Sequence, residues 1–204
     1  MLTDLIITIR RGALAQVPIR IETENLSFAS ITAMSQTAPL QITAPGHGLS
    51  EGWRAWVMNA GGMGELNSAW NNLKESGAYR VSVLDVDNVE FPDVNSSGFR
   101  VYTSGGQLAY RTPLDLSQFT SARMDVKSRP NSTPIVSFNT AAGTLQLDAA
   151  ANVLWLILPT AVTGVLAAAT RFFDIELVKA SGDVVAACSA NSKLIILPEI
   201  TTST

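Results

Sequence analysis

The sequence predicts an all-β protein, an antiparallel β-sandwich with a small β-barrel inserted into it. Short segments in which apolar and polar residues alternate recur along the chain, and turn-forming residues separate them about every ten positions. The opening strands are too few to form a sheet by themselves, so their partners must follow later. Residues 29–108 differ from both flanks in their dense series of Gly and Pro turns. We therefore assign residues 1–28 and 109–204 to the sandwich and residues 29–108 to the barrel.

Two strands are predicted at the start of the chain. Residues 5–10 are mostly β-branched, and residues 17–22 alternate apolar with charged side chains after Arg11 and Gly12. This arrangement indicates a β-hairpin. Pro18 lacks the N–H group that a central strand donates, so the second strand should lie at a sheet edge or begin at Pro18.

After the barrel, about seven further strands are predicted, the number that a sandwich requires. A short helical segment is expected within residues 160–169. The predicted strands cover residues 122–127, 135–138, 145–147, 153–158, 172–178, 184–188 and 193–197.

The central block is organised around residues 42–52, ITAPGHGLSEG, which are followed by the apolar run WRAWVM. Pro45 and the glycines on both sides of His47 indicate a strand, a tight turn and a second strand. Further strands are predicted at residues 79–84 and 89–91, joined by a turn at residues 85–88. A short helix is expected within residues 66–76.

The order of these motifs resembles a known module. The strings ITAPGHGLSEGW, GGMGELN, YRVSVLDVDNVEF, SSGF and YTSGG are similar to the small β-barrel named for the first catalytic-cysteine half-domain of ubiquitin-activating enzymes, in the form found in bacteriophage tail proteins. The resemblance implies a barrel and no ubiquitin chemistry. In those enzymes the barrel does not carry the reactive cysteine, and here Cys188 lies outside the block.

The flanking segments show a second resemblance. The strings IRRGALAQVPIRIE, PLDLSQFTSARMDVKS, FFDIELVKASGDVV and LIILPEIT resemble the small β domain of phage tail and baseplate subunits, such as the N-terminal domain of siphophage upper-baseplate proteins. This implies a virion structural protein of a bacteriophage tail or baseplate. Its expected partners are other tail, baseplate or fibre proteins and further copies of itself in an oligomer.

Composition agrees with an assembly role and disfavours nucleic acid as a partner. The chain has 14 Lys and Arg against 17 Asp and Glu, a net charge of −3, so it offers no basic field for phosphates. Charged residues make up 15% of the chain, below the usual value of about 25%. This favours a subunit that buries surface against neighbours; the alternative is a compact β protein rich in Ser, Thr and Ala.

The sequence favours synthesis in a cytoplasm, and the two resemblances imply that this is the bacterial host cytoplasm and that the final location is the virion. The first residues lack the basic and apolar regions of a secretion signal. The most apolar run, residues 153–169, contains Pro159 and Gly164 and is shorter than the 18 or more residues typical of a membrane-spanning helix. We therefore expect no membrane insertion.

No catalytic, metal or cofactor site is predicted. His47 is the sole histidine and Cys188 the sole cysteine, whereas a zinc site needs several such ligands and a nucleophile needs a base. Asp85 and Asp87 have the spacing of a calcium loop but lack its later Gly and Glu, so they are interpreted as turn residues. An enzyme such as a cell-wall hydrolase would need a carboxylate pair or a metal cluster, which the sequence does not indicate.

Four large side chains of the central block are candidates for an interaction surface: Trp53, Trp56, Met63 and Trp70. The alternative is that the tryptophans form the barrel core. Exposed aromatic rings beside Asn and Asp would instead indicate a carbohydrate- or receptor-binding module at a tail fibre tip. Whether Trp53, Trp56 and Trp70 are exposed or buried distinguishes these functions.

Overall fold

The computed structural model describes residues 4–69, 73 and 77–199, and the chain divides into two compact units. Unit 1 comprises Met1–Glu22 and Pro113–Thr204, and unit 2 comprises Thr23–Thr112. The boundaries differ from the expected ones at 28/29 and 108/109, which would cut through strands β3 (Glu22–Ser30) and β10 (Gln107–Pro113). These two strands pair with each other, so nearly all of both belongs to unit 2.

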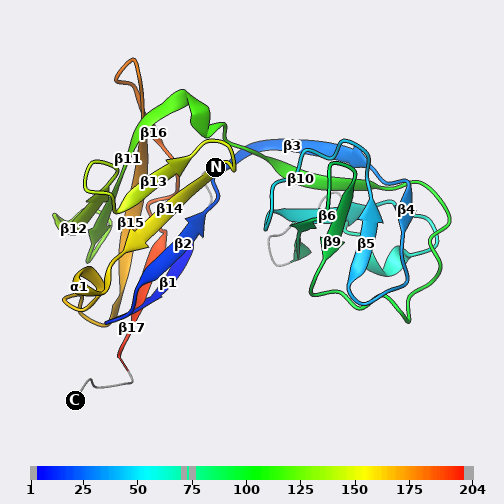
Figure 1. Ribbon diagram of the computed structural model, residues 1–204, viewed down its shortest axis with the longest axis horizontal. Helices are drawn as coiled ribbons and strands as arrows, with labels where there is room; N and C mark the ends of the chain where they lie inside the picture. The colour runs from blue at the N-terminus through cyan, green and yellow to red at the C-terminus, as the bar shows by residue number, and fades with distance from the viewer. Residues whose placement is uncertain (1–3, 70–72, 74–76, 200–204) are drawn as a thin grey trace. The chain divides into compact units, whose positions relative to one another are not determined.

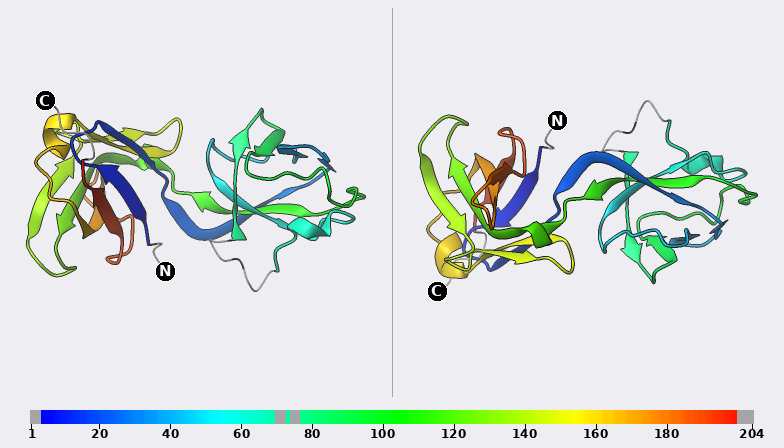
Figure 2. Two further views of the ribbon diagram at one scale, coloured as in Figure 1. Left: turned by 90° about the horizontal axis from the view of Figure 1, so that it is seen from below. Right: turned by 90° about the horizontal axis from the view of Figure 1, so that it is seen from above.

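Unit 1 contains two β-sheets (Figures 1 and 2). The larger sheet has the strand order β1 (Ile6–Arg10), β17 (Lys193–Leu197), β15 (Ala169–Lys179), β11 (Phe119–Lys127) and β12 (Pro134–Asn139), and β16 (Val184–Ala186) also pairs with β15. The smaller sheet has the order β13 (Leu145–Asp148), β14 (Val153–Leu158) and β2 (Ala15–Ile19).

The two sheets of unit 1 bury one shared apolar core. Met124 and Phe173 come from the larger sheet, Leu154 and Leu156 come from the smaller one, and all four are at most 1% exposed. Alternate residues of β11 and β15 are buried because successive side chains of a strand point to opposite faces. The predicted all-β fold is confirmed, and the architecture of unit 1 is consistent with a sandwich.

The predicted opening hairpin is wrong. Strand β1 pairs in parallel with β17, whereas β2 pairs antiparallel with β14 in the other sheet. The turn between them carries the chain across the core, so that Ile7 and Ile19 are buried from opposite layers. Strand β2 is an edge strand, as Pro18 requires.

The predicted helical segment in residues 160–169 is shorter than expected. It forms one turn of helix, α1 (Thr160–Thr163), and Leu166 then packs against the core. Another short turn, the 3-10 helix η4 (Leu116–Gln118), leads into β11; the side chain of Asp115 accepts the N–H of Ser117 at its start.

The residues of unit 2 that the structure describes form two sheets of four strands each. One sheet has the order β3, β10, β6 (Arg54–Met58) and β7 (Tyr79–Arg80). The other has the order β4 (Ala33–Met34), β5 (Leu40–Thr43), β9 (Asn88–Phe91) and β8 (Ser82–Val83).

At two bends of unit 2, an edge strand of one sheet is followed directly along the chain by an edge strand of the other. Strands β7 and β8 are separated only by Val81, whose N–H donates to the carbonyl of Trp53 at 2.7 Å. At the other bend, between β3 and β4, the N–H of Ile31 donates to the carbonyl of Gly106 at 3.0 Å. The two sheets are therefore joined at both edges by the chain itself.

Two local predictions for unit 2 concern residues 42–58 and 66–76. The predicted strand, turn and strand of residues 42–58 are confirmed as β5, the turns that follow it and β6, and the two strands belong to different sheets. A short 3-10 turn, η1 (Gly64–Leu66), lies at the start of the segment in which a helix was expected, and residues 70–72 and 74–76 of that segment lie outside the described residues.

Candidate interaction surfaces

The three described residues that were expected to form an interaction surface are buried. The exposed fraction is 1% for Trp53, 3% for Trp56 and 0% for Met63, while Trp70 lies outside the described residues. The expected surface is therefore wrong for these three side chains. They contribute to packing within unit 2.

Strand β6 explains why neighbouring tryptophans can both be buried. Trp53 lies in the main core of unit 2, and its Nε1 donates to the carbonyl of Arg111 at 3.0 Å. Trp56 projects from the opposite face of the strand and packs with Met58 and Ala109 in a second apolar cluster. Because β6 is covered on both faces, its sequence does not alternate between core and solvent.

His47 connects the turn that opens the central block to the chain around Asp85. Its Nδ1 accepts the N–H of Leu49 at 3.0 Å, so the ring proton lies on Nε2 and is donated to the carbonyl of Asp85, also at 3.0 Å. The hydroxyl of Tyr110 donates to the His47 carbonyl at 2.5 Å. The interpretation of His47 as a turn histidine that hydrogen-bonds the backbone is confirmed.

The Asp85 and Asp87 carboxylates form hydrogen bonds within and between turns. Asp85 Oδ1 accepts the N–H of Asp87 at 2.8 Å, and Asp87 Oδ1 accepts the N–H of Gly46 at 2.9 Å. The side-chain amide of Asn88, followed by the N–H of Asp87, lowers the pKa of Asp85. Within the described parts of the chain, no three His, Cys, Asp or Glu side chains gather in a way that could hold a metal ion.

Cys188 is buried in the core of unit 1. Burial is the main cause that raises the pKa of its thiol. A raised pKa keeps the sulfur in the thiol form, which is a poor nucleophile and metal ligand. This environment agrees with the interpretation of Cys188 as a small apolar core residue.

Three exposed aliphatic residues lie on neighbouring segments at one end of unit 1, and we call this surface the apolar end. It consists of Leu14, Val165 and Leu197, whose exposed fractions are 60%, 82% and 37%. These residues come from the turn after β1, the loop after α1 and the last residue of β17. Sequence reasoning missed this surface because its members are far apart in the chain.

Hydrogen bonds hold the three segments of the apolar end together. Arg11 donates from its backbone N–H to the carbonyl of Leu197 at 2.9 Å and from its Nε to the carbonyl of Gly164 at 3.0 Å. The Thr163 hydroxyl donates to the carbonyl of Ala13 at 2.7 Å. These hydrogen bonds fix the backbone segments that carry the apolar side chains. Exposed apolar patches with polar surroundings are typical of protein–protein contact sites.

A second candidate surface is the outer face of the smaller sheet of unit 1. Trp155, on the central strand β14, projects outward and is partly exposed. It lines a hollow of about 230 Å³ together with Gln16, Gln146 and Ile157. Sequence reasoning missed Trp155 because the run VLWLIL is apolar throughout and does not show which residues face outward.

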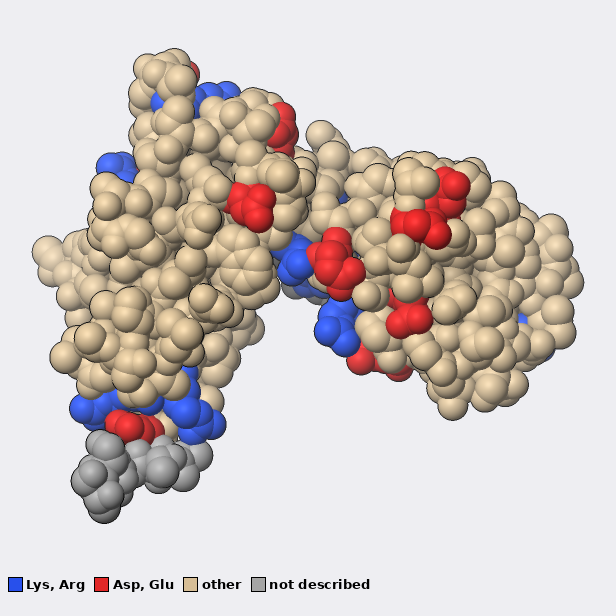
Figure 3. Space-filling view, viewed as in Figure 1, with Lys and Arg blue, Asp and Glu red and all other residues tan. Residues whose placement is uncertain are grey.

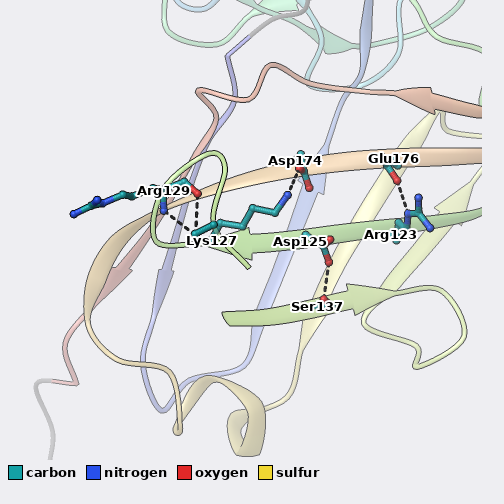
Figure 4. A network of polar contacts seen from close by, with 8 residues as sticks. Arg123, Asp125, Lys127, Arg129, Ser137, Asp174 and Glu176 are labelled. Carbon is teal, nitrogen blue, oxygen red and sulfur yellow. Dashed lines mark hydrogen bonds and ion pairs between the residues drawn. The ribbon is translucent and has the colours of Figure 1, made fainter. Parts of the chain in front are cut away.

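The outer face of the larger sheet carries a row of polar pairs between strands (Figure 4). Lys127 Nζ lies 2.7 Å from Asp174 Oδ2, and Arg123 forms an ion pair with Glu176. The hydrogen bond to Asp174 is the main cause that raises the pKa of Lys127. These charges have partners within the chain, which fits a solvated face.

Comparison with known proteins does not assign the chain to a family: no family model matches it, and no curated sequence is significantly similar to it. In the described residues, every helix is too short or too polar to span a lipid bilayer.

Proposed function

We propose that the chain is a structural subunit of a bacteriophage tail or baseplate and that it acts by assembly. Its partners would be copies of itself and neighbouring tail, baseplate or fibre proteins. The proposed place of synthesis is the host cytoplasm, and the proposed place of action is the virion. No enzymatic step, cofactor, nucleic acid or membrane insertion forms part of this function.

The observation that carries the proposal is the apolar end. Leu14, Val165 and Leu197 are each exposed, and hydrogen bonds join the three segments that carry them. A neighbouring subunit that covers these side chains would gain about 25 cal/mol of binding free energy for each Å² of apolar surface removed from water. Basic side chains lie at the same end of unit 1 in Figure 3, and arginine is enriched in protein interfaces.

The sequence resemblances support the type of assembly. The motifs of residues 42–106 are similar to barrels found in phage tail proteins, and the flanking segments are similar to baseplate domains. The two sheets of unit 2, which the chain joins at both edges, are compatible with such a barrel. The burial of Trp53 and Trp56 removes the aromatic surface on which a fibre-tip function for unit 2 was based.

The oligomeric state of the purified chain tests the role of the apolar end. Wild-type protein is expected to self-associate with rising concentration in sedimentation velocity, and a Leu14→Ser, Val165→Ser variant to remain monomeric. Val184→Ser is the matched control, because Val184 is 49% exposed elsewhere in unit 1. Equal association of the double variant and the wild type would contradict this role.

Mass spectrometry of phage particles tests the location. A structural subunit is expected in purified virions at a fixed ratio to the other tail proteins. Its absence from virions that are otherwise complete would refute the proposed function.

A further inference from the structure

We propose that the outer face of β13, β14 and β2 is a binding site for a neutral saccharide, with Trp155 as its stacking surface. This inference does not depend on the proposed assembly function. It involves a different face of unit 1 from the apolar end, and no residue is shared between the two.

Strand register places Trp155 at the centre of this face. On the adjacent strands, Gln146 of β13 and Pro18 of β2 lie directly opposite Trp155, and Gln16 of β2 lies opposite Ile157. Residues opposite one another on paired strands have neighbouring side chains. The indole therefore lies between an amide on one side and a proline ring on the other, with a second amide one register step away.

The polar groups around the hollow are accessible to a ligand, because Gln16 and Gln146 are exposed. Neither the side-chain amides of Gln16 and Gln146 nor the indole N–H of Trp155 forms a hydrogen bond with any residue that the structure describes. Each amide offers both donors and an acceptor, and the indole offers a donor. A ligand rich in hydroxyl groups can satisfy all of them, because each hydroxyl donates and accepts.

The remaining surface of the hollow favours a ring with an apolar face. The π-system of Trp155 is electron-rich on its face and attracts polarised C–H groups, and Ile157 adds an aliphatic contact. The face of a pyranose ring carries such C–H groups, while its edge carries hydroxyls. One aromatic platform flanked by amides therefore fits this chemistry.

The absence of charged side chains around the hollow disfavours ligands that carry phosphate groups. None of the four side chains that line the hollow is charged, and the face of unit 1 over β13, β14 and β2 has few charged side chains in Figure 3. A phosphate-bearing ligand would need Lys or Arg at this position. A hollow of about 230 Å³ is smaller than usual small-molecule pockets of about 300–1,000 Å³, so we expect one sugar unit to be held, with any further units outside.

The test uses the full chain and a panel of neutral sugars: glucose, galactose, rhamnose, N-acetylglucosamine and their short oligomers. Binding is followed by saturation-transfer NMR and by titration of the Trp155 indole N–H signal, which Trp155→Phe assigns. At least one sugar is expected to bind saturably. Trp155→Ala should weaken it about tenfold, from the loss of stacking, and Trp155→Phe should retain part of the affinity.

Amide variants provide a second measurement that does not alter the apolar surface. Gln16→Ala and Gln146→Ala are expected to weaken binding severalfold, whereas Gln41→Ala, at an exposed glutamine of β5 in unit 2, should have no effect. These variants keep the proposal testable if Trp155→Ala fails to fold.

Three results would overturn the proposal. The first is that no sugar of the panel shifts the Trp155 signal. The second is that binding persists unchanged in a folded Trp155→Ala protein, which would place the sugar elsewhere. The third is that Trp155→Ala abolishes self-association while no sugar binds, which would identify the face as a contact between copies. The assembly proposal fails by a different result, namely equal self-association of the wild type and the Leu14→Ser, Val165→Ser variant.

Discussion

The Nε2 atom of His47 lies 3.0 Å from the carbonyl oxygen of Asp85, and this contact joins two turns of unit 2 that are 38 residues apart. The same turns are linked by the hydrogen bond from the Gly46 N–H to Asp87 Oδ1. Both turns lie at the ends of strands that pair in one sheet, β5 and β9. The histidine therefore fixes the position of one turn against the other.

Replacing His47 with Ala is expected to destabilise unit 2 by about 2 kcal/mol or more, because the Leu49 N–H loses its buried partner and the Asp85 carbonyl loses a donor. Urea unfolding followed by far-UV circular dichroism measures this loss. His47→Gln, which can still donate toward Asp85, should recover part of it. An unchanged midpoint for His47→Ala would contradict the structural role.

Acid should destabilise the turn at Asp85. Its pKa is lowered in the folded chain, so the folded state binds the proton more weakly than the unfolded state. This contribution is present above the ordinary pKa of 3.8 and is lost as pH falls through the lower folded value. Asp85→Asn keeps an acceptor oxygen but cannot titrate, and is expected to reduce the loss of unit 2 stability in acid.

Asp115 provides a matched comparison in unit 1. Hydrogen bonds from the side chains of Ser117 and Gln118, in that order, lower its pKa. Asp115→Asn should reduce the acid sensitivity of unit 1 and leave that of unit 2 unchanged. Hydrogen exchange measured between neutral and acid pH distinguishes the two units. Identical acid profiles for wild type and both variants would show that neither carboxylate contributes.

Trp53→Ala should be among the most destabilising changes in unit 2, with a loss of about 3–5 kcal/mol from removal of a buried large side chain. Trp53→Phe keeps most of the packing but loses the hydrogen bond to Arg111, for a smaller loss of about 1–2 kcal/mol. The free energies of unfolding of both variants, measured by denaturant unfolding, show which change is more destabilising. Equal stability of the Ala and Phe variants would be inconsistent with a packed Trp53.

Unit 1 should fold without unit 2. The N–H of Leu114 donates to the carbonyl of Ile21 at 2.9 Å, so the two chain ends left by removing residues 23–112 lie side by side within unit 1. A short Gly/Ser linker can join them, because loop closure changes by only about 0.6 kcal/mol for each doubling in length. The shortened protein is expected to unfold cooperatively in a thermal scan.

The matching truncation removes residues 1–22 instead. It deletes strands β1 and β2 and the buried Ile7, Ile9 and Ile19, so cooperative unfolding should be lost. If the truncated chain is stable and the linker variant is unfolded, unit 1 does not fold independently of unit 2, and the prediction is wrong.

Strands with one buried face were predictable from the sequence, as residues 172–178 of β15 illustrate. Each alternate side chain there is buried, and the sequence alternates accordingly. The pairing of β1 with β17 was not predictable, because local pattern does not specify which distant strand is the neighbour. A short turn between two strands suggested a hairpin, although the chain crosses the core at that point.

The candidate surfaces were less predictable than the fold. Trp56 was a candidate for exposure because aromatic residues are common at interfaces, yet β6 is covered on both faces. The segments that carry Leu14 and Val165 are joined only in three dimensions, by the hydrogen bond from the Thr163 hydroxyl to the Ala13 carbonyl. Trp155 lies within a wholly apolar run, so its outward direction depends on the register of the sheet and not on any sequence motif.

The parallel pairing of β1 with β17 has a consequence for the time course of synthesis. The hydrogen bond from the Leu5 N–H to Ser192 Oγ spans 187 residues, so β1 leaves the ribosome long before its neighbour β17 is synthesised. Residues 23–112 of unit 2 are all translated before the rest of unit 1 and can fold meanwhile. Contacts of such high sequence separation form slowly, and an unpaired β-branched strand is prone to aggregation until they do. Nascent chains halted before residue 193 are therefore expected to engage chaperones through residues 6–10.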